Sequence, residues 1–100
     1  MNKVELLFKD RGISRAGTYV YTKQTAIDFV NECRKLNIGI LGIDALIIRG
    51  DFTEPSIANS IDFTATPYLQ NFPKNIWDAS IIFLEQRDDI YYFEIVCSDE

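Results

Sequence analysis

The run of residues 36–50 constrains the fold more than any other stretch, because it is the most apolar segment of the chain and is rich in isoleucine. Apolar residues fill both alternating positions, which predicts a central strand covered on both faces. We expect this strand to be continuous or broken into two shorter strands at residues 38–41 and 44–49. Gly39 and Gly42 lie inside the run, and glycine within a strand often marks a bulge or a close approach of two backbones.

Asp44 is an acidic residue in the middle of this apolar run. A buried carboxylate needs hydrogen-bond donors or an opposite charge, since burial otherwise drives it to the neutral form. We therefore expect Gly42, Ile43 and Asp44 to form a structural corner, where the strand meets solvent or backbone amides bond the carboxylate. A direct functional role for Asp44 is the alternative.

The first part of the chain is expected to hold two strands and a helix. Apolar and charged residues alternate over residues 3–9, which predicts a strand. A β-branched and aromatic segment predicts a brief second strand at residues 18–21. Apolar residues three and four positions apart then predict a helix over residues 22–36, with Thr22 as its N-cap.

After the central run, the sequence predicts a long connection and a second helix. Residues 51–72 are polar and proline-containing and lack helical periodicity, so we expect a loop there with at most a short strand at residues 61–64. The helix is predicted over residues 73–87, beginning with its proline in the first turn or with Asn75 as N-cap. Its broad apolar stripe includes Ile82.

Residues 90–97 alternate between an apolar set and a mixed set, which predicts a final strand with one buried and one partly exposed face. The order of strands and helices predicts an α+β, or α/β, two-layer sandwich in which two helices pack on a small mixed sheet. At 100 residues the chain is expected to form a single domain, residues 1–100.

The chain has no histidine, which removes the commonest general base, the commonest metal ligand and every nucleophile–histidine pair. Together with the lack of catalytic motifs, this predicts a protein that is not an enzyme and that holds no metal or cofactor. Cys33 and Cys97 are expected to be reduced thiols in a cytoplasmic protein, although the sequence leaves a disulfide open. Charges within residues 1–9 argue against a signal peptide, and no segment predicts a membrane helix.

The charge of the chain is distributed unevenly. Residues 1–36 hold seven basic and four acidic residues, a net charge of +3, whereas residues 37–100 hold three basic and eleven acidic residues, a net charge of −8. The total of −5 disfavours binding to nucleic acid phosphates and favours a basic protein partner. Net charge of this size also serves ordinary solubility.

A pattern of residues that covers most of the chain carries a resemblance to a known family: Thr22, Ala26, Ile27, Phe29, Val30, Asn37, Ile38, Ile40, Leu41, Gly42, Ile43, Asp44, Trp77, Ala79, Tyr91, Tyr92, Phe93, Glu94, Ile95 and Val96. With this pattern the sequence resembles the Immunity protein 40 family of bacterial polymorphic-toxin systems, although it has Ile43 where the family more often has glycine. The resemblance implies a small cytoplasmic protein that binds and blocks a cognate toxin domain, and it implies no catalytic residue.

We expect the toxin contact to come from the long connection and from the polar side of the second helix, because acidic side chains there can occlude a basic active site such as that of a nuclease. The partner is thus a basic toxin domain, not a nucleic acid or a membrane, and the protein is expected to be a monomer or a weak homodimer. The candidate contact residues are Asp51, Glu54, Asp62, Tyr68, Asp78 and Glu85.

Two other functions remain open on the sequence. An acidic inhibitor that mimics nucleic acid would present carboxylates in a phosphate-like array over one face. A small ligand-binding or enzymatic domain centred on Asp44 would have a concave pocket beside that residue and a perturbed carboxylate.

Overall fold

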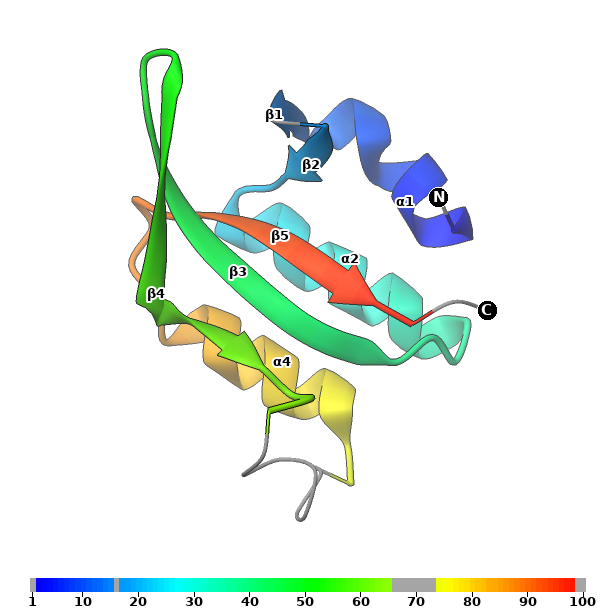
Figure 1. Ribbon diagram of the computed structural model, residues 1–100. Helices are drawn as coiled ribbons and strands as arrows, with labels where there is room; N and C mark the ends of the chain where they lie inside the picture. The colour runs from blue at the N-terminus through cyan, green and yellow to red at the C-terminus, as the bar shows by residue number, and fades with distance from the viewer. Residues whose placement is uncertain (1, 16, 66–73, 99–100) are drawn as a thin grey trace.

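A computed structural model describes residues 2–15, 17–65 and 74–98. Most of the elements lie in two layers, with the main sheet in front and α2 and α4 behind it, while α1 lies to one side (Figure 1). In chain order they are α1 (Lys3–Phe8), the short 3₁₀ helix η1 (Lys9–Arg11), β1 (Ile13–Arg15), β2 (Thr18–Val20), α2 (Lys23–Lys35), β3 (Ile40–Arg49), β4 (Phe52–Asp62), α4 (Ile76–Glu85) and β5 (Tyr92–Cys97).

The main sheet has the strand order β4-β3-β5, and α2 and α4 both pack on one of its faces (Figure 1). This confirms the expected α+β two-layer sandwich. The pairing in the described chain is antiparallel throughout, so the expectation of a mixed sheet was wrong. β4 and β5 run in the same direction, but β3 lies between them and is antiparallel to both. These two parallel strands are therefore not paired with each other.

Residues 3–9 form α1 and η1, so the strand predicted there was wrong. The Asn2 side chain accepts a hydrogen bond from the Glu5 backbone N–H at 2.9 Å, and the Glu5 carboxylate accepts one from the Asn2 N–H at 3.2 Å. This reciprocal capping box starts a helix. Val4 and Phe8 then lie one helical turn apart on the buried side. The buried residues of this segment therefore follow the period of a helix and not the alternation that predicts a strand.

The second strand is confirmed as β2, which pairs with β1 in a small separate sheet. The chain then touches the outer edge of the main sheet at one point. The Tyr21 N–H donates to the Phe93 carbonyl at 2.8 Å, and the Phe93 N–H donates to the Tyr21 carbonyl at 2.7 Å. This bridge fixes the β1-β2 hairpin beside β5.

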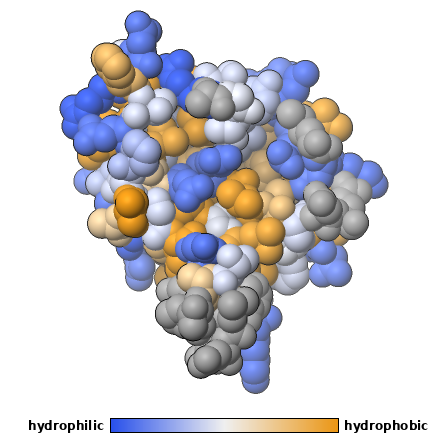
Figure 2. Space-filling view, in the orientation of Figure 1, coloured by the Kyte–Doolittle hydropathy of each residue, from blue (hydrophilic) through white to orange (hydrophobic). Residues whose placement is uncertain are grey.

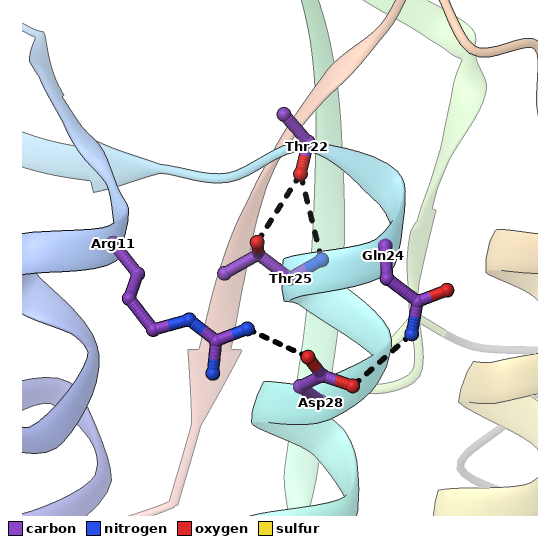
Figure 3. A network of polar contacts seen from close by, with 5 residues as sticks. All are labelled: Arg11, Thr22, Gln24, Thr25 and Asp28. Carbon is purple, nitrogen blue, oxygen red and sulfur yellow. Dashed lines mark hydrogen bonds and ion pairs between the residues drawn. The ribbon is translucent and has the colours of Figure 1, made fainter.

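The helix predicted over residues 22–36 is confirmed as α2. Thr22 is its N-cap, and its hydroxyl accepts a hydrogen bond from the Thr25 N–H at 3.5 Å (Figure 3). On the next turn the Asp28 carboxylate accepts hydrogen bonds from Arg11 at 2.6 Å and from Gln24 at 3.1 Å (Figure 3). The Arg11 contact ties η1 to α2. The opposite side of α2 enters the core through Ala26, Phe29, Val30 and Cys33.

Strand β3 is continuous, and a two-residue turn joins it directly to β4. The long connection predicted over residues 51–72 was therefore wrong in its first half. Gly50 takes a positive φ of 58° in this turn, which glycine adopts without steric cost. β4 is an edge strand with one solvated side, so it tolerates the polar residues and Pro55 that made the segment resemble a loop.

The second predicted helix is confirmed as α4, although it is shorter than expected. Asn75 is the N-cap, and its side chain accepts a hydrogen bond from the Asp78 N–H at 3.0 Å. The proline predicted in the first turn lies outside the described residues. Ile82 is 55% exposed rather than part of the buried stripe. Ser80 is fully buried instead, and its hydroxyl donates to the Ile76 carbonyl at 2.7 Å.

Trp77 anchors α4 to the segment before β3. Its indole Nε1–H donates to the buried Ile38 carbonyl at 2.8 Å, while its ring packs against the core. No helix in the described ranges is both long enough and apolar enough to span a membrane.

Candidate functional site

The face of the main sheet that points away from α2 and α4 is uncovered, because no described element packs on it (Figure 1). We call it the open face. The prediction that the central strand is covered on both faces was therefore wrong. Figure 2 shows the molecule from this side, with apolar residues gathered over the middle of the sheet and hydrophilic residues among them.

Two adjacent hollows mark the open face, with volumes of about 300 and 510 Å³. Both are lined by Asp44, Ile61 and Asp62, so they meet near the middle of β3. Their apolar lining residues include Leu41 and Val96 in the smaller hollow and Leu46, Pro55 and Ile57 in the larger one. An uncovered apolar surface of this kind is typical of a binding site.

The charged residues that line these hollows, among those described, are all acidic: Asp44, Asp62 and Glu94. Asp44 on β3 lies directly opposite Glu94 on β5. Like charges at directly opposite positions of neighbouring strands destabilise a sheet. The pairing of β3 with β5 therefore places two negative charges at adjacent positions of the open face.

Hydrogen bonds hold two of these carboxylates in place. The Thr18 hydroxyl donates to Glu94 Oε2 at 2.8 Å. Asp62 Oδ1 accepts from the Thr64 hydroxyl at 2.6 Å and from the Thr64 N–H at 2.9 Å. The two Thr64 hydrogen bonds hold the pKa of Asp62 below its ordinary value, because they favour the charged form. Asp62 therefore stays negatively charged throughout the neutral range.

A bulge in β4 forms the rim of the larger hollow. The β3-β4 register moves from Ile43 opposite Ile61 to Ala45 opposite Ser56, so four β4 residues, 57–60, correspond to the single β3 residue Asp44. β-bulges next to binding sites commonly re-aim side chains. Here the bulge leaves Ile57 89% exposed at the edge of the hollow.

Side-chain hydrogen bonds fix this bulge. Ser60 Oγ accepts from the Ala45 N–H at 2.8 Å and donates to the Ser56 carbonyl at 2.7 Å, so it replaces a ladder bond that the bulge removes. Asn59 Nδ2 lies 2.9 Å from both Ser56 Oγ and the Tyr91 hydroxyl. These bonds tie the bulge to β3 and to Tyr91, the residue before β5, so the rim is preorganised.

The expectation for the two glycines of the central run is confirmed at Gly42. The β3-β5 register is irregular between Ile40 and Gly42. A Cβ atom on Gly42 would lie 3.0 Å from the Ile61 carbonyl oxygen, so the backbones of β3 and β4 approach closely there. Asp44 follows on the exposed side of the strand, in agreement with the solvent-exposed alternative for this residue.

The structure separates the six candidate contact residues. Of those described, Asp62 alone lines the hollows of the open face. Asp51 lies in the β3-β4 turn, whereas Glu54 lies on β4 opposite Ile47 and forms an ion pair with Arg49 at 2.8 Å. The turn is seven β3 residues from the partner of Asp62, or about 23 Å at the usual rise of a strand.

Two further candidates lie on α4, away from the open face. Asp78, in the first turn of α4, forms an ion pair with Arg34 of α2 at 2.6 Å. Glu85 is exposed at the end of α4, in the layer behind the sheet. Tyr68 lies outside the described residues. The five described candidates therefore do not share one surface.

The sequence predicts mainly a structural role for Asp44, and it predicts only a partly exposed strand face for Glu94. In the structure both residues line a hollow of the open face. Nothing local in the sequence shows that these two residues are neighbours, because the pairing of β3 with β5 brings them together across fifty residues. The alternation of side chains between the two faces of the last strand is the sequence signal that places Glu94 on the face away from the core.

The chemistry of the open face suits non-covalent recognition. In the described part of the chain, no three His, Cys, Asp or Glu side chains are grouped so that they could hold a metal ion. Apolar surface provides contact area, and the carboxylates select for positive charge.

Fold and open face together define a small α+β domain with one uncovered, acidic sheet face. No family model matches the chain, and neither a curated protein nor a solved structure shows significant similarity to it. Function therefore has to be inferred from the residues of the open face.

Proposed function

We propose that this protein is a cytoplasmic immunity protein that binds a basic domain of a cognate bacterial toxin and occludes its active site. The observation that carries the proposal is the open face, whose hollows are lined by apolar residues and by acidic residues alone among the charged side chains described. The resemblance to the Immunity protein 40 family favours the same function.

The partner is assigned by charge complementarity. A second copy of this chain would bring the same carboxylates against one another and would be repelled, whereas a basic domain would neutralise Asp44, Asp62 and Glu94. The net charge of −5 adds long-range attraction for such a domain and raises the association rate. The apolar part of the face supplies the area that is buried on contact.

The proposed interface differs from the one expected from the sequence. Asp62 remains in it, and Asp44 and Glu94 join it. Asp51 and Glu85 lie away from the hollows and are exposed, so they serve as controls that change net charge without touching the proposed contact.

Co-expression tests the function directly. The toxin domain to use is one encoded immediately upstream, at the variable C-terminal end of a large toxin gene. We expect the wild-type protein to restore growth of cells that express this domain and to co-purify with it. Failure of both rescue and co-purification would refute the proposed function.

Paired variants test the interface within the same assay. Asp44→Asn combined with Glu94→Gln should weaken binding at least about tenfold, because it removes the facing carboxylates of the open face. Asp51→Asn combined with Glu85→Gln removes the same net charge and should change the Kd less than about threefold. Equal losses in the two double variants would show that the open face is not the contact.

A small ligand in the hollows is the second candidate, because a concave site lies beside Asp44 as that alternative requires. It predicts that metabolite mixtures perturb backbone amides around Asp44 and Ser60 in NMR spectra of the free protein. A nucleic-acid mimic is less favoured, since several acids that a phosphate-like array would need lie off the open face: Asp51, Glu54, Asp78 and Glu85.

A further inference from the structure

The fold brings the two cysteines together on the helix side of the sheet. Cys33 projects from the buried face of α2, and Cys97 is the last residue of β5, on the same strand face as Phe93 and Ile95. Neither cysteine is in a disulfide. Cys33 belongs to the buried core cluster, Cys97 packs against that cluster, and the two thiols are close enough to interact. This contact has no role in the proposed binding function, because it lies behind the open face.

The two thiols have different surroundings. Cys33 is fully buried, whereas Cys97 is half-buried. The hydrogen bond to Cys97, together with burial, holds the pKa of the Cys33 thiol far above its usual range. Cys97 Sγ also accepts a hydrogen bond from Asn2 Nδ2 at 2.9 Å, so it can be reached from the N-terminal side of the molecule, whereas Cys33 is enclosed. Cys97 is therefore the outer, first-reacting thiol and Cys33 the inner one.

We propose that Cys33 and Cys97 form a redox modification site that a small disulfide of the glutathione class converts to an intramolecular disulfide. The Cys97 thiolate attacks one sulfur of glutathione disulfide, forms a mixed disulfide and releases one glutathione thiolate. Cys33 then gives up its proton, and its sulfur attacks Cys97 Sγ and releases the second glutathione. Two cysteine thiols are oxidised, and one glutathione disulfide is reduced to two glutathione thiols that take up the two protons.

The bond would join α2 to β5 across most of the chain. A cross-link between distant residues restricts the unfolded chain and therefore stabilises the folded one. Val96, the neighbour of Cys97, lies on the opposite side of β5, where it lines a hollow of the open face. Oxidation should thus raise stability without changing the surface proposed to bind the toxin.

Treatment of the purified protein with excess glutathione disulfide tests this site without any toxin. We expect the wild-type intact mass to fall by two hydrogen atoms, proteolysis to give a fragment that links Cys33 to Cys97, and the Tm to rise on the order of 10 °C. A reductant should reverse all three changes.

Single variants separate the two steps. Cys33→Ala should retain one glutathione on Cys97, because the resolving thiol is gone, and Cys97→Ala should leave Cys33 unmodified in the folded state. Circular dichroism checks that both variants fold, and Cys33→Ser is the substitute if the alanine variant does not. The inference is overturned if wild-type protein keeps two free thiols, stops at a glutathione adduct or forms only intermolecular disulfides.

Discussion

At the scale of single residues, the open face depends on a glycine. Gly42 lets β3 and β4 approach so closely that an added Cβ would lie 3.0 Å from the Ile61 carbonyl oxygen. At Gly39, three positions earlier, a Cβ would lie 3.4 Å from the Ser98 hydroxyl, at the edge of ordinary contact. An added methyl group would therefore press against backbone atoms at Gly42 but only against a side chain at Gly39.

Replacement of these glycines should show the difference. We expect Gly42→Ala to lower the free energy of unfolding by about 1–3 kcal/mol, since backbone atoms must move to accommodate the methyl group. Gly39→Ala is the matched control, and we expect a change within about 1 kcal/mol because only a side chain must adjust. Urea denaturation measures both. An equal effect of the two substitutions would contradict this account of Gly42.

At the scale of elements, the sequence predicts correctly the helices and strands whose apolar pattern extends over many residues. The two main helices and the last strand were identified because periodicity over many residues separates helix from strand. The sequence does not predict α1, because apolar and charged residues alternate over residues 3–9 as they do in a strand. The capping box between Asn2 and Glu5 instead determines a helical conformation. β4 was missed because an edge strand with a bulge has no sustained alternation.

The candidate site was less predictable than the fold. Its carboxylates come from three strands, and the sequence predicts only one of them, Asp62, as a candidate contact. Binding surfaces of this kind depend on register, and a shift of one residue would turn Asp44 or Glu94 to the opposite face. Composition predicted the acidic character of the molecule but could not predict which acids meet.

The β4 bulge provides a test at this scale, because Ser60 supplies the partner that the Ala45 N–H would otherwise lack. Ser60→Ala leaves this buried N–H unpaired, so we expect a loss of about 1–3 kcal/mol in the free energy of unfolding. Ser60→Thr keeps the hydroxyl and should retain most of the stability. Hydrogen exchange at the Ala45 amide should be faster in the alanine variant alone, and equal exchange in both variants would exclude this role.

The contact between η1 and α2 should depend on pH. The hydrogen bond from Arg11 holds the pKa of Asp28 below its ordinary value of 3.8, so the stabilisation is complete above that value and is lost as pH falls through the lower folded-state pKa. At pH 7 we expect Arg11→Gln to cost up to about 1 kcal/mol, since the pair is partly exposed.

A double-mutant cycle with Asp28→Asn isolates this interaction. Arg11 also stacks on the Phe8 ring, with its guanidinium carbon 4.8 Å from the ring centre, and that contact does not depend on the charge of Asp28. We therefore expect the coupling energy of the cycle, measured by denaturation, to vanish in strongly acid solution while part of the Arg11→Gln effect remains. A coupling energy that does not change with pH would argue against the charge-dependent interaction.

At the scale of the whole molecule, charge and contact surface should act on different rate constants. Every acidic residue contributes to the long-range field that steers a basic partner, but only residues of the open face touch it in the proposed complex. Field effects change the association rate and are screened by salt, because the Debye length is about 8 Å at physiological ionic strength. Loss of buried contacts mainly raises the dissociation rate.

Association kinetics with the toxin domain can separate these contributions. We expect Asp51→Asn with Glu85→Gln to slow association about two- to threefold at low salt, to have no effect at high salt and to leave dissociation unchanged. Asp44→Asn with Glu94→Gln should slow association similarly, because the net charge changes equally, and should raise the dissociation rate about tenfold at every salt concentration. If both pairs altered only association, the acidic face would act by attraction from a distance and the contact would have to lie elsewhere on the molecule.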